Sequence, residues 1–193
     1  MWSYYDKLGF GHSPQIGFPG AVAGRLRPAK NWRPIEQATM SYGHGVTVSL
    51  LQQVRAYTVF ARDGDMIELS IYKDRAYREP QRVYSAKTAG QMRDMLAKVV
   101  EKGGTGFRAR VEGYTAAGKT GTAQTGQFDA DGRELLHYWF AGFYPADAPR
   151  YTITVLQDSQ QKPQTSSAAL FAQVADALAV LDAAITEKPA ENS

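Results

Sequence analysis

A lysine, two threonines and a glycine stand together at Lys119-Thr120-Gly121-Thr122, and their types suit the binding of a carboxylate beside an acyl group. Lys119 brings a positive charge, and the hydroxyls of Thr120 and Thr122 can donate hydrogen bonds to a carboxylate. Gly121 lets a ligand approach the backbone closely. In a strand with an accessible face, a backbone N–H could also stabilise a carbonyl oxygen that becomes anionic. These residues are therefore candidates for an acyl-transfer site.

The same segment admits a second interpretation, because residues 113–120 match the phosphate-binding pattern G-x-x-x-x-G-K-[ST]. That site needs an apolar strand before the loop and a helix after it. Residues 107–112 are too charged for a central strand, and residues 121–127 are a poor helix start. Asp158 could imitate a carboxylate that holds Mg²⁺. Nucleotide binding is thus the less favoured alternative, and a strand over 116–123 would argue against it.

Hydrophobic patterning predicts an α/β chain of the α+β type, with an antiparallel sheet flanked by helices. Consecutive strands near 114–125, 137–144 and 150–157 form a meander, and the first of them carries Lys119. A further strand is expected over 66–72, and residues 9–34 read as an irregular connector. Helices are expected over 34–40, 47–64 with Thr47 as cap, 85–102 with Ser85 as cap, and 166–185. The last helix has an apolar stripe at Phe171, Val174, Leu178, Leu181 and Ile185.

Composition excludes several classes of protein. With 193 residues, 44% of them hydrophobic and 21% charged, the chain suits one globular domain rather than a disordered segment. It has no apolar run of about 18 residues, and its N-terminus lacks the pattern of a signal peptide. It has no cysteine, which excludes disulfide scaffolds and thiol catalysis. Residues 1–110 carry a net charge of +8 and the rest −5, but the arginines are scattered and no nucleic-acid motif accompanies them.

Longer motifs stand in a specific order along the chain. They are residues 17–20 (GFPG), 32–45 (WRPIEQATMSYGHG), 55–57 (RAY), 103–106 (GGTG) and 118–123 (GKTGTA). With them, the sequence from about Gly9 to Asp182 resembles the C-terminal part of the transpeptidase domain of class B penicillin-binding proteins. It is most similar to the division-type peptidoglycan D,D-transpeptidases of proteobacteria. The resemblance implies part of the penicillin-binding, serine β-lactamase-like fold, in which Lys-Thr-Gly is a known motif.

The resemblance also implies roles for individual residues. Thr120 and Thr122 would bind the carboxylate of a terminal D-alanine or of a β-lactam, and the N–H of Thr122 would be one oxyanion donor. Lys119 would shape the proton and charge environment of the nucleophile, and Gly121 would belong to the substrate-binding strand. The loop over 125–136 would border the cleft, with Gln124 and Phe128 as possible wall residues.

The nucleophile itself is missing from the expected place. In the family it is the serine of S-x-x-K, which must begin a helix so that the lysine, one turn on, can take its proton. Ser70 with Lys73 and Ser159 with Lys162 match the letters, but one pair falls in an expected strand and the other in an expected loop. The second family motif, S-x-N, does not occur. We therefore expect both true motifs to lie upstream, and the 193-residue chain alone to be inactive.

Residues 1–193 would then be the C-terminal portion of one domain, with a helical and irregular part (1–106), strands plus a last helix (107–185) and a polar tail (186–193). The missing N-terminal part would be its first partner, and its absence should leave an exposed edge strand. Peptidoglycan stem peptides and β-lactams are the implied ligands, with a membrane glycan polymerase and division proteins as partners of the full-length protein.

The implied location is the periplasmic face of the inner membrane, with an anchoring helix that this chain lacks. No cofactor and no nucleic acid are expected. No metal is expected either, since His12, His44 and His137 show no ligand spacing. A catalytically silent penicillin-recognising sensor or scaffold module is the alternative to an enzyme.

Overall fold

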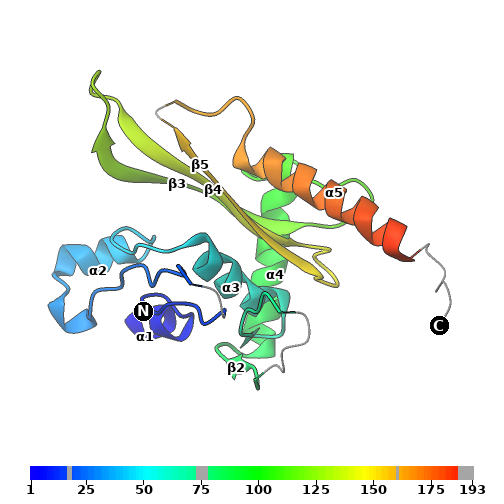
Figure 1. The fold of residues 1–193 in the computed structure, drawn as a ribbon, viewed down its shortest axis with the longest axis horizontal. Helices are drawn as coiled ribbons and strands as arrows, with labels where there is room; N and C mark the ends of the chain where they lie inside the picture. Colours follow the sequence, from blue (N-terminus) through cyan, green and yellow to red (C-terminus); the bar gives the residue numbers. More distant parts are fainter. Residues whose placement is uncertain (17–18, 73–77, 160, 187–193) are drawn as a thin grey trace. The chain divides into compact units, whose positions relative to one another are not determined.

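The computed structural model describes residues 1–16, 19–72, 78–159 and 161–186, with side chains up to residue 183. The chain divides into two compact units, Met1–Asp94 and Met95–Ser193, and each is described by itself (Figure 1). Helix α4 (Ala86–Val100) begins in the first unit and ends in the second. Among the described residues, no helix is both long and apolar enough to cross a membrane.

The first unit is mostly helical and irregular. Its elements are α1 (Trp2–Lys7), η1 (Ala29–Asn31), α2 (Pro34–Met40), α3 (Leu50–Ala61), β1 (Asp65–Met66) and β2 (Gln81–Arg82). The predicted bounds of α2 are confirmed, with Pro34 in its first turn. Helix α1 was not predicted; the indole of Trp2 donates to the backbone carbonyl of Arg27 at 3.0 Å, a contact 25 residues away along the chain.

The N-terminal cap of α3 corrects the prediction for Thr47. Ser49 is the cap: its hydroxyl accepts from the N–H of Gln52 at 3.2 Å, and its own N–H donates to Oε1 of Gln52 at 2.9 Å. Thr47 instead pairs with Arg25 in an isolated β-bridge. Because that bridge holds Thr47 in extended backbone, the helix starts two residues later.

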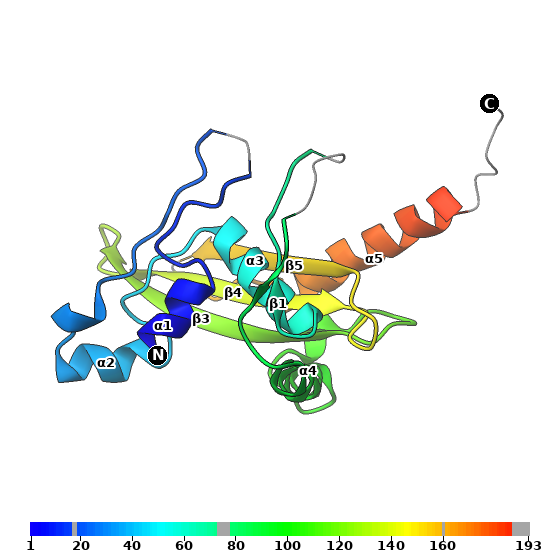
Figure 2. The same cartoon turned by 90° about the horizontal axis from the view of Figure 1, so that it is seen from below.

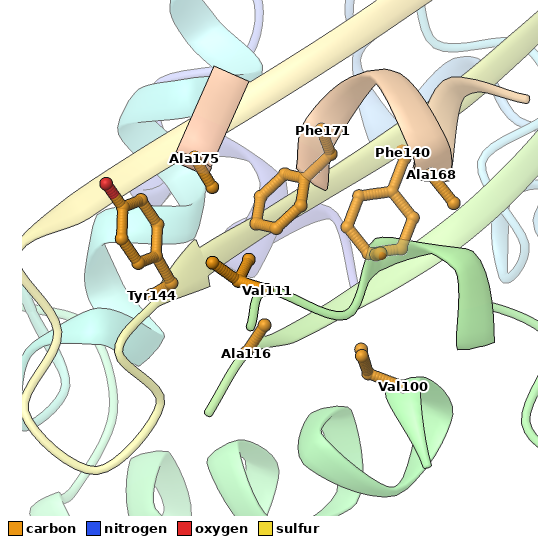
Figure 3. Close-up of a cluster of buried hydrophobic side chains, with 9 residues drawn as sticks. Val100, Val111, Ala116, Phe140, Tyr144, Ala168, Phe171 and Ala175 are labelled. Carbon is orange, nitrogen blue, oxygen red and sulfur yellow. The ribbon is translucent and has the colours of Figure 1, made fainter. Parts of the chain in front are cut away.

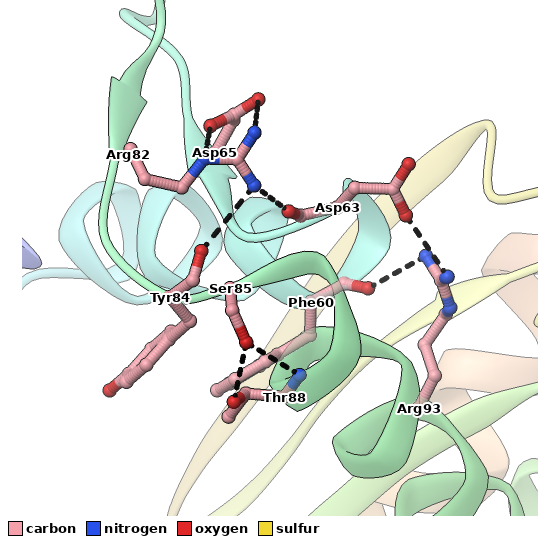
Figure 4. A network of polar contacts seen from close by, with 8 residues as sticks. All are labelled: Phe60, Asp63, Asp65, Arg82, Tyr84, Ser85, Thr88 and Arg93. Atoms are coloured by element: carbon pink, nitrogen blue, oxygen red, sulfur yellow. Dashed lines mark hydrogen bonds and ion pairs between the residues drawn. The ribbon is translucent and has the colours of Figure 1, made fainter.

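The predicted strand over 66–72 is wrong beyond Met66. Strand β1 pairs with the two-residue β2, with Asp65 opposite Arg82, so residues 67–72 have no hydrogen-bonded strand beside them. The connection from α3 through β1 and β2 to α4 is fixed by polar contacts instead (Figure 4). Arg82 lies 2.9 Å from Asp65, and Arg93 lies 3.2 Å from Asp63. Ser85 caps α4 as predicted, since its hydroxyl accepts from the N–H of Thr88 at 3.1 Å.

The second unit contains the predicted antiparallel meander. After α4 come η2 (Phe107–Ala109), β3 (Ala117–Phe128), β4 (Glu134–Tyr144), β5 (Tyr151–Ser159) and α5 (Ser167–Thr186). The strand order is β3-β4-β5, and α5 packs on β4 and β5 (Figure 2). Within the described residues β3 and β5 have β4 as their one strand neighbour, which agrees with the expected exposed edge.

The core of this unit lies between the sheet and α5 (Figure 3). The rings of Phe140 and Phe171 are fully buried and 4.8 Å apart between centroids. The apolar stripe predicted for α5 is partly wrong, because Val174 and Leu181 are exposed. Small residues at Ala168, Ala172 and Ala175 are buried instead, since they let the helix backbone approach the aromatic rings of the sheet. The side chain of Ile185 lies outside the described residues.

Candidate active site

The segment Lys119 to Thr122 lies in β3, as the acyl-transfer interpretation predicts. Lys119 is opposite Ala141 of β4, and Thr122 is opposite Tyr138. Strand β3 is at the edge of the described sheet, so along its outer side alternate residues offer N–H and C=O groups that β4 does not use. An edge strand therefore gives a ligand access to backbone donors as well as to side chains.

Lys119 and Thr120 start from opposite faces of the sheet, yet their polar groups meet. Thr120 and Thr122 share the face of Phe140, because Thr120 lies opposite Phe140 in the register and side chains alternate along a strand. The Nζ atom of Lys119 donates to the backbone carbonyl of Thr120 at 2.9 Å and lies 3.4 Å from its hydroxyl oxygen. Lys119 and Thr122 are exposed and Thr120 is half-buried, so a cation and hydroxyls are all open to a ligand.

Two glycines in β3, Gly118 and Gly121, differ in the space available for a side chain. A Cβ atom on Gly118 would lie 2.6 Å from the ring of Phe140, so the core ring occupies the place of a side chain. A Cβ atom on Gly121 would meet Trp139 at 3.6 Å, which is an ordinary contact. The fold therefore requires Gly118, whereas packing within the described residues leaves room for a side chain at Gly121.

Thr105 also contacts the site, a contact that was not predicted from the sequence. The hydroxyl of Thr120 donates to the hydroxyl oxygen of Thr105 at 3.2 Å. Thr105 lies in the turn between α4 and η2, whose Gly106 N–H donates to the carbonyl of Val99 at 2.9 Å. The resemblance included residues 103–106, but nothing in the spacing of the sequence places Thr105 beside Thr120.

The loop expected over 125–136 is mostly strand, because β3 runs to Phe128 and β4 begins at Glu134, and the expected wall residues Gln124 and Phe128 both lie in β3. The amide of Gln124 donates to Glu134 at 2.9 Å, and the other carboxylate oxygen of Glu134 accepts from the N–H of Gly126 at 2.9 Å. The side chain of Phe128 is 64% exposed at the end of β3. Because Glu134 holds both the Gln124 side chain and the hairpin backbone, Gln124 is positioned, whereas Phe128 projects into solvent.

Neither S-x-x-K serine begins a helix. Ser70 lies in the irregular stretch after β1, where its hydroxyl donates to the carbonyl of Tyr72 at 3.0 Å and accepts from the N–H of the same residue at 3.0 Å. Lys73 lies outside the described residues. Ser159 is the last residue of β5, rather than a loop residue, and accepts from the N–H of Gln161 at 3.2 Å. The helix geometry that activates a serine through a lysine is absent at both described serines.

The structure argues against the phosphate-binding interpretation of residues 113–120. Lys119 and Thr120 lie inside a strand, and a turn and another strand follow them, so no helix N-terminus is available for a phosphate.

The histidines considered as metal ligands lie beside single carboxylates. His12 lies 2.8 Å from Asp6, and His137 lies 3.2 Å from Asp158. The part of the chain that the structure describes has no group of three or more residues able to hold a metal ion.

A pocket lined by tyrosines, beside the end of β4 and the start of β5, was not predicted from the sequence. It has a volume of about 280 Å³ and is lined by Tyr114, Tyr144, Pro145, Arg150, Tyr151, Ala179, Asp182 and Ala183. Tyr144 is 2% exposed, and its hydroxyl has no hydrogen-bond partner. Burial, and then the neighbouring Tyr151 and Asp182, raise the pKa of Tyr144 to about 12. Its phenol therefore stays neutral in a pH range in which an ordinary tyrosine ionises.

A Lys-Thr-Gly segment in a strand, on an antiparallel sheet covered by a C-terminal helix, agrees with the penicillin-recognising fold that the sequence resemblance implies. Comparison with protein families agrees: residues 1–176 match the family model described as the penicillin binding protein transpeptidase domain. The chain belongs to this family, and the resemblance found in the sequence is confirmed.

Two curated relatives are named as peptidoglycan D,D-transpeptidases, and both match most of this chain. The chain is 42% identical over 161 residues to "Probable peptidoglycan D,D-transpeptidase PenA" of Neisseria gonorrhoeae, which covers 82% of this chain and 27% of the relative. It is 32% identical over 176 residues to "Peptidoglycan D,D-transpeptidase FtsI" of Escherichia coli, which covers 90% of this chain and 30% of the relative.

The transpeptidase domain of penicillin-binding protein 3 from Burkholderia pseudomallei has a similar structure, with a TM-score of 0.81 and 40% identity. The match covers 100% of this chain and 59% of that one. The chain thus spans less than a third of the length of both named curated relatives.

Proposed function

We propose that this chain is part of a serine-type peptidoglycan D,D-transpeptidase, which cross-links stem peptides through an acyl-enzyme. The observation that carries the proposal is the edge position of Lys119 to Thr122 on β3, in a chain that belongs to the transpeptidase family. A donor-rich, exposed strand suits the capture of a peptide with a carboxylate end, because the ligand can lie along the strand edge.

Each residue of the motif has a proposed role in that reaction. The hydroxyls of Thr120 and Thr122 donate hydrogen bonds to the substrate carboxylate, and the N–H of Thr122 stabilises the oxyanion. Lys119 supplies a positive charge beside the reacting serine. When the serine oxygen attacks the acyl carbon, its proton passes to a base; the amide bond then breaks, the same base returns the proton to the leaving nitrogen of D-alanine, and the acyl group is held as an ester. Gly121 leaves the space in which the ligand approaches the strand.

The serine is proposed to come from a part of the protein outside these 193 residues. Ser70 and Ser159 both hydrogen-bond to the local backbone, and neither begins a helix, which is the setting in which a lysine one turn on could take the serine proton. The chain is therefore expected to carry the Lys-Thr-Gly side of the site and not the nucleophile.

The test is to incubate the 193-residue chain, and the natural protein that contains it, with a fluorescent penicillin and to measure intact mass. The natural protein should gain one penicillin, and the chain alone none. A stoichiometric adduct on Ser70 or Ser159 of the chain would overturn the proposed location of the nucleophile. Reversible binding without an adduct in the natural protein would favour a silent penicillin-recognising module.

The ligands and partners follow from the same proposal. Stem peptides and β-lactams would occupy the β3 edge, while the rest of the domain would complete the sheet. For the full-length protein we propose an anchored position at the periplasmic face of the inner membrane, with a glycan polymerase and division proteins as partners. Fractionation of cells that express a tagged natural protein would test this position, and recovery in the cytosolic fraction would contradict it.

A further inference from the structure

Thr105 is held beside the Lys-Thr-Gly strand by a rigid turn. Its neighbours Gly104 and Gly106 both approach the end of α4: a Cβ atom on Gly104 would lie 2.1 Å from the carbonyl oxygen of Val99, and the N–H of Gly106 donates to that oxygen at 2.9 Å. A Cβ atom on Gly106 would also lie 2.9 Å from the ring of Phe140. The turn is therefore closely packed on both sides, and the exposed side chain of Thr105 is presented from a fixed backbone.

The hydroxyl of Thr120 lies between Thr105 and Lys119. It donates to the hydroxyl oxygen of Thr105 at 3.2 Å, while Nζ of Lys119 lies 3.4 Å from its oxygen. A threonine hydroxyl has one proton and two acceptor positions, and the proton rotates to suit its partners. A carboxylate can only accept, so a Thr120 that binds one must turn its proton away from Thr105.

We propose that Thr105 is a positioning residue for carboxylate recognition by Thr120. When Thr120 turns its proton to the ligand, the hydroxyl of Thr105 reverses its role and donates to the oxygen of Thr120. The two hydroxyls and the carboxylate then form one chain of hydrogen bonds, in which each bond polarises the next. Thr105 touches no reacting atom, so its effect reaches the ligand only through Thr120.

This inference rests on the proposed function and predicts a selective defect. Thr105→Val keeps the shape of the side chain and removes the hydroxyl, whereas Thr105→Ser keeps the hydroxyl. In the natural protein that contains this chain, we expect Thr105→Val to weaken the affinity for a penicillin with a free carboxylate by about three- to tenfold, the range for one lost hydrogen bond. The limiting acylation rate should change little, and Thr105→Ser should restore the affinity.

The decisive comparison uses the same penicillin with its carboxylate esterified. The ester has no anionic group for Thr120, so its capture should be equal in the wild type, Thr105→Val and Thr105→Ala. Thr154→Val on β5 is the matched control, since it makes the same chemical change at a buried hydroxyl without a partner.

The acid and ester measurements distinguish a failure of the Thr105 proposal from a failure of the proposed function. Equal losses for the acid and the ester, or no loss for either in both Thr105→Val and Thr105→Ala, would overturn the role of Thr105 and leave the proposed function standing. A wild-type natural protein that takes up no penicillin would overturn the proposed function, and this inference with it.

Discussion

The hydroxyls of Thr105 and Thr120 form a hydrogen bond of 3.2 Å between two residues that are 15 positions apart. The bond joins the turn that ends α4 to the edge strand that carries the Lys-Thr-Gly segment. The same turn packs on Phe140 of the neighbouring strand β4. Thr120 is thus oriented both by its strand and by an element outside the sheet, so its side chain has a defined direction before any ligand arrives.

Replacing Thr120 by valine should impair β-lactam capture and leave the fold intact. The change removes the hydroxyl while keeping the β-branched shape that suits a strand. In the natural protein we expect the second-order rate of penicillin acylation to fall about tenfold or more, because a hydrogen bond to a charged carboxylate contributes about 1.5–3 kcal/mol. Thr154→Val should acylate at the wild-type rate. An unchanged rate in Thr120→Val would contradict the assignment of Thr120 to the carboxylate.

Gly118→Ala should lower the stability of the fold, whereas Gly121→Ala should lower the capture of penicillin. Gly118→Ala places a methyl group 2.6 Å from the ring of Phe140, so we expect the free energy of unfolding to fall by about 1–3 kcal/mol. Gly121→Ala meets an ordinary contact of 3.6 Å and should leave stability within about 0.5 kcal/mol, while penicillin capture is lowered. Urea unfolding and acylation rates separate the two. A Gly121→Ala variant with full acylation would show that the ligand does not need this space.

The buried hydroxyl of Tyr144 should make the chain sensitive to alkaline pH. Its folded-state pKa of about 12 exceeds the ordinary 10.0, so the fold favours the neutral phenol. This contribution to stability is fully present below about pH 10 and is lost as the pH rises through about 12. Tyr144→Phe removes an unpaired buried hydroxyl and cannot ionise, so it should equal or exceed the wild type in stability at pH 8.

The difference between the two proteins should then grow with pH. At pH 11 we expect the advantage of Tyr144→Phe to be larger by about 1.4 kcal/mol, the value of one pKa unit. Chemical denaturation at pH 8 and pH 11 measures both values. A difference that is the same at the two pH values would mean that Tyr144 ionises normally.

Gln52 should be essential to the irregular N-terminal segment. It is 1% exposed, and its amide nitrogen donates to the carbonyls of Gly9, His12 and Ala23 at 3.1, 3.0 and 2.7 Å. Gln52→Leu leaves these carbonyls without their donor, so we expect a loss of about 3 kcal/mol and faster proteolysis of the segment. Gln53→Leu, at the next and half-buried position of α3, is the matched control and should change both measurements little. Equal effects of the two substitutions would point to helix polarity rather than to the buried amide.

Local sequence patterns were enough to predict the class of fold and the strand that carries Lys119 to Thr122. Residues 119–122 were expected in the first strand of an antiparallel meander with a helix after it, and β3, β4, β5 and α5 have that order. These features are readable because they depend on local patterns, a period of two in strands and of about 3.6 in helices. Ser85 was found as a cap for the same reason, since its partner Thr88 is three residues away.

Tertiary structure decided the features that join distant parts of the chain. The predicted strand over 66–72 ended at Met66 because a strand needs a partner, and β2 offers two residues. The buried face of α5 includes alanines in place of some of the larger residues predicted for it, because the rings of Phe140 and Tyr144 already fill the space beneath the helix. The contact of Thr105 with Thr120 and the burial of the Tyr144 hydroxyl depend on how separate elements pack. No local pattern carries that information, because packing is fixed by the whole set of neighbours rather than by spacing along the chain.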